Sequence, residues 1–180
     1  APEAWLALHI AYVYHQPVRD GKLRSPTERR EDLQAALGYL EQAQKLAPGL
    51  VESYNLAGAI YLELDDVDRA AHSYYASLER EPSQPNLLVA VAELEHGRGD
   101  SEAAISLIDR AAEEGASDAL YILARRYFED WDLWRSREVL NRYFAAPASS
   151  LTRPEAIALQ ASLNRRLTGI SSSLVVLLLL

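Results

Sequence analysis

The sequence predicts an all-helical protein built from helix pairs that repeat along the chain. The first observation is a period, because segments that end alike close at Pro48, Pro82 and Ala116, at intervals of 34 residues. Within each segment, small and large apolar residues recur at spacings of three and four, which places them on one face of a helix. Short stretches such as residues 97–101, rich in Gly and Asp, favour a helix end followed by a helix start. Together these observations predict a solenoid of stacked helical hairpins.

The second helix of each hairpin shows the repeated face most clearly. In three segments, a small residue is followed by a large one four positions later and by another small one three positions after that. These residues are Ala36, Leu40 and Ala43, then Ala70, Tyr74 and Ser77, then Ala104, Ile108 and Ala111. In the first helix of the second hairpin, a small pair lies between two large residues. The small pair is Ala57 and Gly58, and the large residues are Tyr54 and Tyr61. We expect the small residues to let neighbouring helices approach closely.

This arrangement resembles the tetratricopeptide repeat (TPR) family, whose unit of about 34 residues carries the pattern W-x2-L-G-x2-Y, A-x3-F-x2-A and a terminal Pro. The resemblance implies a right-handed α-solenoid of about four helical hairpins with a C-terminal capping helix, as in a bacterial TPR scaffold or interaction domain. The predicted solenoid occupies residues 1–169. Its hairpins are expected at about 2–50, 51–84, 85–117 and 118–149, and the capping helix at 152–168, stopped by Gly169.

The first hairpin departs from the repeat in two ways. Trp5, Leu8 and Tyr12 occupy the large positions of its first helix, but His9 stands where a small residue is expected. Extra residues, at about 15–30, then separate this helix from the second one. They are rich in Pro, Gly, Arg and Lys and predict a long, locally basic loop insertion. A second docking site for an acidic partner and a tolerated surface loop are both open interpretations of it.

Residues 170–180 form an apolar tail that ends in seven consecutive apolar residues from Leu174. Seven apolar residues are too few to span a bilayer, which needs about twenty. Ser171 to Leu180 is interpreted as the start of a membrane segment, as an extended peptide bound in a groove of the same or another copy, or as an artificial addition to the natural chain. Self-association through the tail therefore stays open.

The composition limits the class of partner. The chain has 180 residues, of which 49% are apolar and 24% charged, as in a single globular domain. Its formal net charge of -8 opposes binding to phosphate backbones, so we expect no nucleic-acid partner. The absence of Cys excludes disulfides and thiolate metal ligands. The absence of Met leads us to expect a processed chain or a piece of a longer one, without a recognisable secretory signal.

No residue pattern for catalysis stands out. Glycine-rich phosphate-binding loops are absent, and the four His residues are scattered along the sequence. Glu63, Asp65 and Asp66 fall at a predicted turn, where carboxylates cap the next helix. Trp131 and Trp134 flank the fourth turn and are attributed to packing or to a partner contact. The sequence therefore predicts no enzyme, no cofactor and no metal site.

The resemblance places the binding surface on the concave side of the solenoid, where the first helix of each hairpin lines a groove. Carried over to this chain, the lining residues are Leu6, Ile10, Val13, Tyr14, Asn55, Ala59, Leu62, Glu63, Val89, Glu93, His96, Ile122, Arg126 and Glu129. The set is apolar with a few polar points, which suits an apolar or amphipathic segment. Asn55 is expected to bind backbone amides and Arg126 a carboxylate, while the Glu residues oppose an acidic tail. A solvated face that binds nothing is the other interpretation.

The predicted function is a protein–protein interaction scaffold that binds a partner segment in its concave groove. The resemblance extends this to the assembly of a bacterial envelope complex for secretion, pilus formation or polysaccharide export. The alternatives are a chaperone-like TPR protein that shields an apolar client segment, and an accessory domain of a larger enzyme. The compartment stays undetermined between bacterial cytoplasm and periplasm, with no membrane span in this chain and any membrane association through parts outside it.

Overall fold

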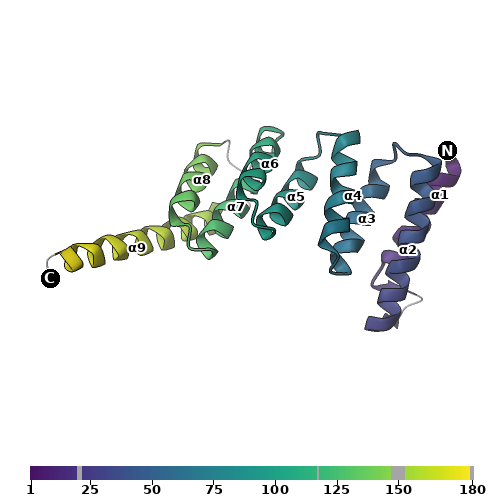
Figure 1. The fold of residues 1–180 in the computed structure, drawn as a ribbon, viewed down its shortest axis with the longest axis horizontal. Coiled ribbons are helices and arrows are strands. Elements are labelled where there is room, and N and C mark those ends of the chain that lie inside the picture. Colours follow the sequence, from purple (N-terminus) through teal and green to yellow (C-terminus); the bar gives the residue numbers. More distant parts are fainter. Residues whose placement is uncertain (20–21, 117, 147–152, 179–180) are drawn as a thin grey trace. The chain divides into compact units, whose positions relative to one another are not determined.

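The chain folds into helices that pair as antiparallel hairpins, which confirms the predicted all-α solenoid (Figure 1). The computed structural model describes residues 1–19, 22–116, 118–146 and 153–178, and the side chains of all of these except 18, 19, 22 and 170–178. Within these ranges, four hairpins are followed by one C-terminal helix.

The helices are α1 (Pro2–His15), α2 (Pro26–Leu46), α3 (Val51–Glu63), α4 (Val67–Arg80), α5 (Pro85–Gly97), α6 (Ser101–Glu113), α7 (Asp118–Glu129), α8 (Leu133–Ala145) and α9 (Arg153–Leu178). A short antiparallel ribbon of β1 (Val18–Arg19) and β2 (Lys22–Leu23) joins α1 to α2. The chain divides into two compact units, Ala1–Leu87 and Leu88–Leu180.

The first unit has its core where α1, α2 and α3 meet. α1 packs along α2, and α3 packs against α2 and α4. The repeat residues Ala36, Leu40 and Ala43 of α2 are buried in this core. Gly58 of α3 lies against Tyr74 of α4, so closely that an added Cβ would come within 2.3 Å of the ring. The small positions of the repeat are therefore the places where helices touch.

α1 faces the core with residues other than those that the sequence predicted. Its buried residues are Ala4, Ala7, Leu8 and Ala11. Of the three residues at the predicted large positions, only Leu8 is buried, whereas Trp5 and Tyr12 are exposed. The predicted register of α1 is therefore wrong by one residue.

The register of α1 keeps His9 out of the core. In α3, Tyr54, Gly58 and Tyr61 have the spacing that the sequence assigned to Trp5, His9 and Tyr12. In that register the polar ring of His9 would be buried against α2, whereas the observed register buries Leu8 and leaves His9 exposed. α1 instead turns its alanine-rich face toward α2, which allows the two helices to approach closely.

Residues 15–30 are not the long loop that the sequence predicted. α1 continues to His15, the ribbon follows, and α2 begins at Pro26. Ser25 and Glu28 form a capping box, in which Ser25 Oγ accepts from the Glu28 N–H at 3.4 Å and Glu28 Oε2 accepts from the Ser25 N–H at 2.9 Å. Pro26 occupies the first turn, where its missing N–H has no consequence. The extra residues thus form a ribbon and an early start of α2.

Three of the turns inside hairpins share one geometry. In each, a residue with positive φ precedes an Asp, whose N–H donates to the carbonyl five residues earlier. The positive-φ residues are Asp65, Gly99 and Trp131, with φ of 60°, 89° and 62°. The Asp donors are Asp66, Asp100 and Asp132, at 2.8, 2.9 and 2.9 Å from the carbonyl oxygens of Tyr61, Glu95 and Tyr127. A residue in the left-handed region followed by this hydrogen bond is a Schellman cap, which ends the preceding right-handed helix.

The same Asp residues begin the next helices. The carboxylates of Asp66, Asp100 and Asp132 accept hydrogen bonds from the N–H groups three residues later, at 3.0, 3.0 and 3.1 Å. Each bond satisfies an N–H that has no partner within the helix. One turn design therefore recurs in both units.

In the second unit, α7 packs against α6 and α8, and α9 packs against α7 and α8. Ser136 Oγ donates to the Ala124 carbonyl at 2.8 Å inside the α7–α8 hairpin. The guanidinium of Arg166, on α9, lies 3.9 Å from the ring centroid of Phe128 and 4.3 Å from that of Trp131. These cation–π contacts, with a bond from Arg166 to the Phe128 carbonyl at 3.2 Å, hold α9 against the α7–α8 turn.

α9 continues past Gly169, where the sequence predicted its end, and reaches Leu178. Gly ends a helix where the backbone turns to positive φ, and Gly169 does not adopt a positive φ. It is accommodated inside the helix at a cost of about 1 kcal/mol relative to Ala. Among the described residues, no helix is both long enough and apolar enough to span a membrane. The side chains of the apolar tail lie outside the described residues, so its expected contacts stay predictions.

Candidate functional site

A small hollow in the second unit brings together four of the predicted groove residues. Glu93 and His96 come from α5, while Ile122 and Arg126 come from α7. The remaining lining residues are the buried Ala92, Ile108 and Leu123. The hollow thus has an apolar floor and a rim that carries both signs of charge.

His96 connects the two helices that form the hollow. Its Nε2 lies 2.6 Å from Oδ2 of Asp130, the residue that follows α7. Its ring meets Tyr127 edge to face, with centroids 5.6 Å apart. Only 11% of the His96 side chain is exposed. These contacts hold the imidazole at the rim, so the hollow is formed before any ligand arrives.

The guanidinium of Arg126 is about half exposed at the rim of the hollow. Glu129 Oε2 lies 3.9 Å from it, and the same carboxylate lies 3.6 Å from Arg125. Exposed pairs of this kind contribute about 0.2–1 kcal/mol, so a carboxylate of a partner can compete for Arg126. Glu129 and Val89, which the sequence also assigned to the groove, are not among the residues that line the hollow.

In the first unit, the predicted apolar groove residues differ in how open they are to solvent. Leu6 and Val13 of α1 and Leu62 of α3 are exposed. Ile10 and Ala59 are half-buried. The exposed members are those that a partner can reach without a rearrangement of the helices.

Two other predicted groove residues of the first unit are engaged within the fold. Tyr14 stacks on Tyr39 of α2, with ring centroids 5.7 Å apart. Asn55 Nδ2 donates to Gln84 Oε1 at 2.8 Å, and among the described residues Asn55 Oδ1 is buried without a hydrogen-bond partner. The amide of Asn55 is therefore directed into the fold, and the backbone-binding role expected for it stays untested.

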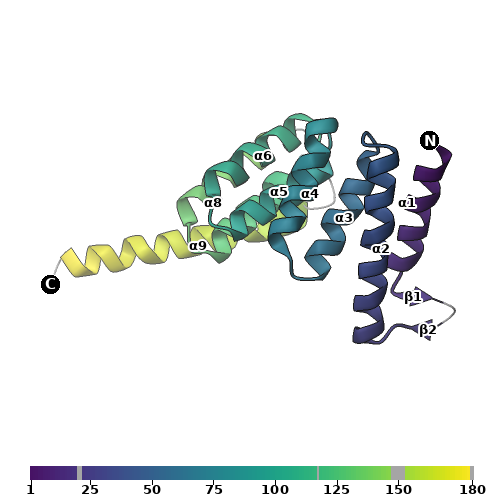
Figure 2. The same ribbon diagram turned by 45° about the vertical axis from the view of Figure 1, so that its right-hand side comes forward.

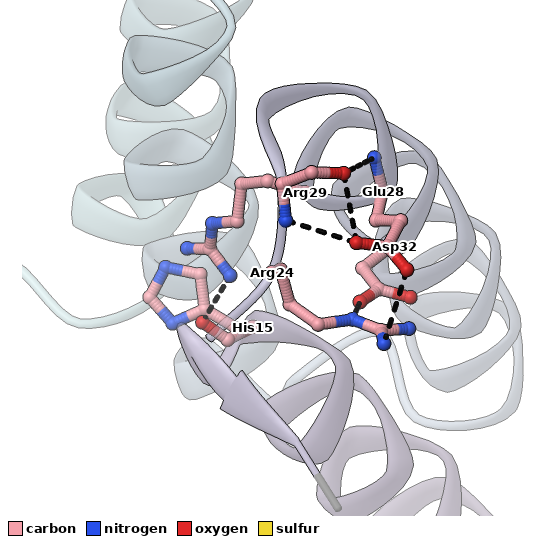
Figure 3. Close-up of polar contacts among 6 residues, drawn as sticks. His15, Arg24, Glu28, Arg29 and Asp32 are labelled. Atoms are coloured by element: carbon pink, nitrogen blue, oxygen red, sulfur yellow. Dashed lines mark hydrogen bonds and ion pairs between the residues drawn. The ribbon is translucent and has the colours of Figure 1, made fainter. Parts of the chain in front are cut away.

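Glu63 forms an ion-pair cluster with two residues of the 15–30 segment. Its Oε2 lies 2.6 Å from Arg29 Nη2, and its Oε1 lies 2.5 Å from His15 Nε2. Arg29 Nη1 also donates to the His15 carbonyl at 2.6 Å (Figure 3). Partial burial raises the pKa of Glu63, but the hydrogen bonds and charges of Arg29 and His15 outweigh it and hold the pKa below its ordinary value. The negative charge of Glu63 is thus largely compensated within the fold.

Two basic side chains of the 15–30 segment, those of Arg24 and Arg29, hold α2 in place. Arg24 Nε donates to Asp32 Oδ2 at 2.7 Å, and Arg24 Nη1 lies 3.7 Å from Glu28 (Figure 3). Arg29 is bound to Glu63, as described above. Two of the Arg residues expected to attract an acidic partner are therefore already paired, which favours a structural role for the segment.

Sequence reasoning missed the exposed aromatic residues of α1. Trp5 and Tyr12 were assigned to the large positions of the repeat, and both face solvent. The signal that could have found them is the alanine spacing at positions 4, 7 and 11, which marks the close-packed face of the helix. In the second unit, Trp131 and Trp134 are each 66% exposed and are covered in part by Arg166 and Arg137.

The acidic turn at residues 63–66 has structural roles. Asp66 caps α4, and its hydrogen bonds with Arg69 hold its pKa below the ordinary value. Asp65 takes the left-handed position of the turn. In the described parts of the chain, no three His, Asp or Glu side chains gather in a way that could hold a metal ion.

The comparisons with known proteins define the fold class. No family model and no curated protein matches the chain. Among solved structures, a MamA protein matches with 14% identity and a TM-score of 0.64, over 92% of this chain and 88% of that one. A tetratricopeptide repeat protein from Parabacteroides merdae matches with 16% identity and a TM-score of 0.66, over 92% and 62%. The Thermobaculum terrenum O-GlcNAc transferase matches with 15% identity and a TM-score of 0.57, over 79% of this chain and 26% of that one.

These likenesses show a TPR-type helical repeat fold, as the sequence predicted. Identities of 14–16% carry the fold and no more. Any function must therefore be argued from the surfaces of this chain.

Proposed function

We propose that this protein is an interaction scaffold that binds a segment of a partner protein in the hollow between α5 and α7. The observation that supports the proposal is the convergence of Glu93, His96, Ile122 and Arg126, from the first helices of two successive hairpins, around an apolar floor. A preformed concavity with few polar groups is the usual form of a binding site.

The chemistry of the hollow defines the segment that fits it. The hollow is shallow, with about 10 Å³ of space, so an apolar side chain of the segment lies over the floor of Ala92, Ile108 and Leu123 and against Ile122 rather than inside a pocket. Burial of this contact supplies most of the affinity. Arg126 on the rim selects a carboxylate, and Glu93 selects a basic group. Because both signs of charge stand on one rim, they fix the direction of the bound segment more than its affinity.

The test is affinity capture of partners from a lysate of the source cells with four immobilised forms of the chain. The forms are the unchanged chain, Ile122→Glu, Arg126→Ala and the control Arg125→Ala. Arg125 is on the same helix, is similarly exposed and does not line the hollow. Circular dichroism must first confirm that each variant keeps its helical content.

We expect one partner to be retained by the unchanged chain and by Arg125→Ala. Its recovery should fall at least about 10-fold with Ile122→Glu, which puts a charge on the rim, beside the apolar floor. Arg126→Ala should lower the affinity about 2- to 5-fold, the range of one exposed ion pair. Equal capture by all four folded forms would contradict the proposal.

A second candidate function rests on one observation. The matched structure of an O-GlcNAc transferase is a much longer chain, of which this chain covers 26%. Repeat hairpins are thus also found joined to an enzyme, and this chain is a candidate accessory domain of a larger one. The reading frame on either side of this sequence tests that candidate, since a catalytic domain in it would support an accessory role.

A further inference from the structure

The outward face of α1 is an apolar surface that none of the described side chains of the first unit covers. We define this face as Trp5, Leu6, His9, Tyr12 and Val13. The four apolar members are exposed to 55, 61, 41 and 45% in chain order. In both views, α1 lies at the edge of the first unit with α2 on one side (Figure 2). Exposed large side chains that gather in this way indicate an interaction surface.

The charge of the face limits what can cover it. It contains no Asp, Glu, Lys or Arg, although the chain as a whole has a net charge of -8. Two copies of an acidic chain repel each other, and like charges placed across an interface weaken it further. A face without these four residue types is therefore a place where a second copy can approach with little of this penalty.

The order of residues on the face is self-complementary about His9. Trp5 and Leu6 precede His9 by four and three residues, while Tyr12 and Val13 follow it by three and four, so all four surround it on the helix surface. When two such helices pair in antiparallel fashion about a two-fold axis at His9, Trp5 meets Tyr12 of the other copy. Leu6 then meets Val13 of the other copy. Aromatic side chains thus face aromatic ones, and aliphatic side chains face aliphatic ones.

We propose that the outward face of α1 binds the same face of a second copy of this chain, in an antiparallel, two-fold symmetric helix pair. An isologous contact of this kind closes on itself and gives a dimer rather than a filament. The proposal concerns only the first unit, so it is independent of the hollow between α5 and α7.

The size of the face sets the strength of the dimer. α1 has 14 residues and is about 21 Å long. The exposed parts of its four large side chains amount to about 400 Å² per copy, about half the area of a standard interface. We therefore expect a weak, concentration-dependent dimer with a dissociation constant of about 10 µM or weaker.

The first experiment is sedimentation velocity of the chain over a concentration series that brackets this value. The unchanged chain should shift from monomer to dimer. Leu6→Lys alone and Val13→Glu alone should each abolish the shift, because they place charges in an apolar contact. The double variant Leu6→Lys/Val13→Glu should restore it, because antiparallel pairing puts each Lys opposite a Glu of the other copy. Ile157→Lys, at an exposed apolar residue of α9, is the control and should dimerise normally.

The second experiment uses the fact that the chain has no Cys. In the variant His9→Cys, the new thiols lie next to each other at the two-fold axis, so mild oxidation should give a covalent dimer. Gln42→Cys, at an exposed position of α2, should stay mostly monomeric under the same conditions.

Several outcomes would overturn the proposal. A chain that sediments as a monomer at all concentrations leaves the face for another protein. A dimer that survives both Leu6→Lys and Val13→Glu forms elsewhere, for example through the apolar tail. Loss of the dimer in the single variants without recovery in the double variant rules out the antiparallel register, as does equal cross-linking of the two Cys variants.

Discussion

At the scale of single residues, the absence of a side chain at Gly58 sets how closely α3 and α4 approach. An added Cβ would lie 2.3 Å from the ring of Tyr74, which is buried in the fold. We predict that Gly58→Ala lowers the free energy of unfolding by about 1–3 kcal/mol, measured by urea denaturation.

The control for this prediction is Gly38→Ala in α2. Gly38 is exposed in a helix, and an added Cβ there meets nothing within 4 Å. Because Ala favours a helix over Gly by about 1 kcal/mol, this substitution should be stabilising. If both variants change stability in the same direction, close packing at Gly58 is not the reason for its small size.

Glu63 gives a prediction about pH. Its pKa is lowered in the folded chain, so its stabilising contribution is present above the ordinary pKa of Glu, about 4.3, and is lost as the pH falls through the lower folded value. Glu63→Gln should therefore destabilise the chain at pH 7 by no more than about 1 kcal/mol, since the site is partly exposed. The difference should shrink between about pH 5 and pH 3, as measured by urea denaturation at each pH. A difference that does not depend on pH would show that the ion pairs with Arg29 and His15 contribute nothing.

The sequence was enough to place some of the predicted site residues on one surface, but not all of them. Ile122 and Arg126 could be assigned to a common surface because helix periodicity fixes which side of α7 they occupy. Asn55 could not be judged in this way, because its partner Gln84 lies 29 residues away in the linker before α5. Contacts between side chains of different elements depend on packing that no local pattern records.

At the scale of elements, the Asp N-caps explain why the hairpins start where they do. Asp100 is the cap of α6 and accepts a hydrogen bond from the Ala103 N–H at 3.0 Å. Asp100→Ala leaves that N–H without its partner and should lower the free energy of unfolding by about 1 kcal/mol. Asp100→Asn keeps an oxygen acceptor and should be nearly neutral, so equal melting temperatures for the two variants would contradict the capping role.

The elements that the sequence mispredicted were decided by contacts across the fold. The period of 34 residues was enough to find the hairpins, because three segments end at the same spacing. The register of α1 depended instead on whether His9 fits against α2. The early start of α2 was readable in principle from Ser25 and Glu28, whose spacing is that of a capping box. The end of α9 was mispredicted because Gly169 was taken as a stop, although Gly stops a helix only in a left-handed conformation.

At the scale of the whole molecule, the TPR-type fold presents two separate surfaces with different chemistry. The hollow between α5 and α7 combines an apolar floor with charges of both signs, as expected for a segment bound in one direction. The outward face of α1 has no Asp, Glu, Lys or Arg and is symmetric about His9, as expected for a surface that binds a copy of itself. The fold alone distinguishes neither role, so each surface must be tested by itself.

The measurement that tests the central proposal most directly is site-specific photocrosslinking in a lysate of the source cells. A photoreactive side chain is placed at position 122, on the rim of the hollow, or at position 106, on the exposed side of α6, in place of Ile122 or Ser106. We predict that position 122 yields one dominant crosslinked protein and that position 106 does not. A crosslinked protein that appears equally at both positions, or at position 106 alone, would contradict the assignment of the hollow as the binding site.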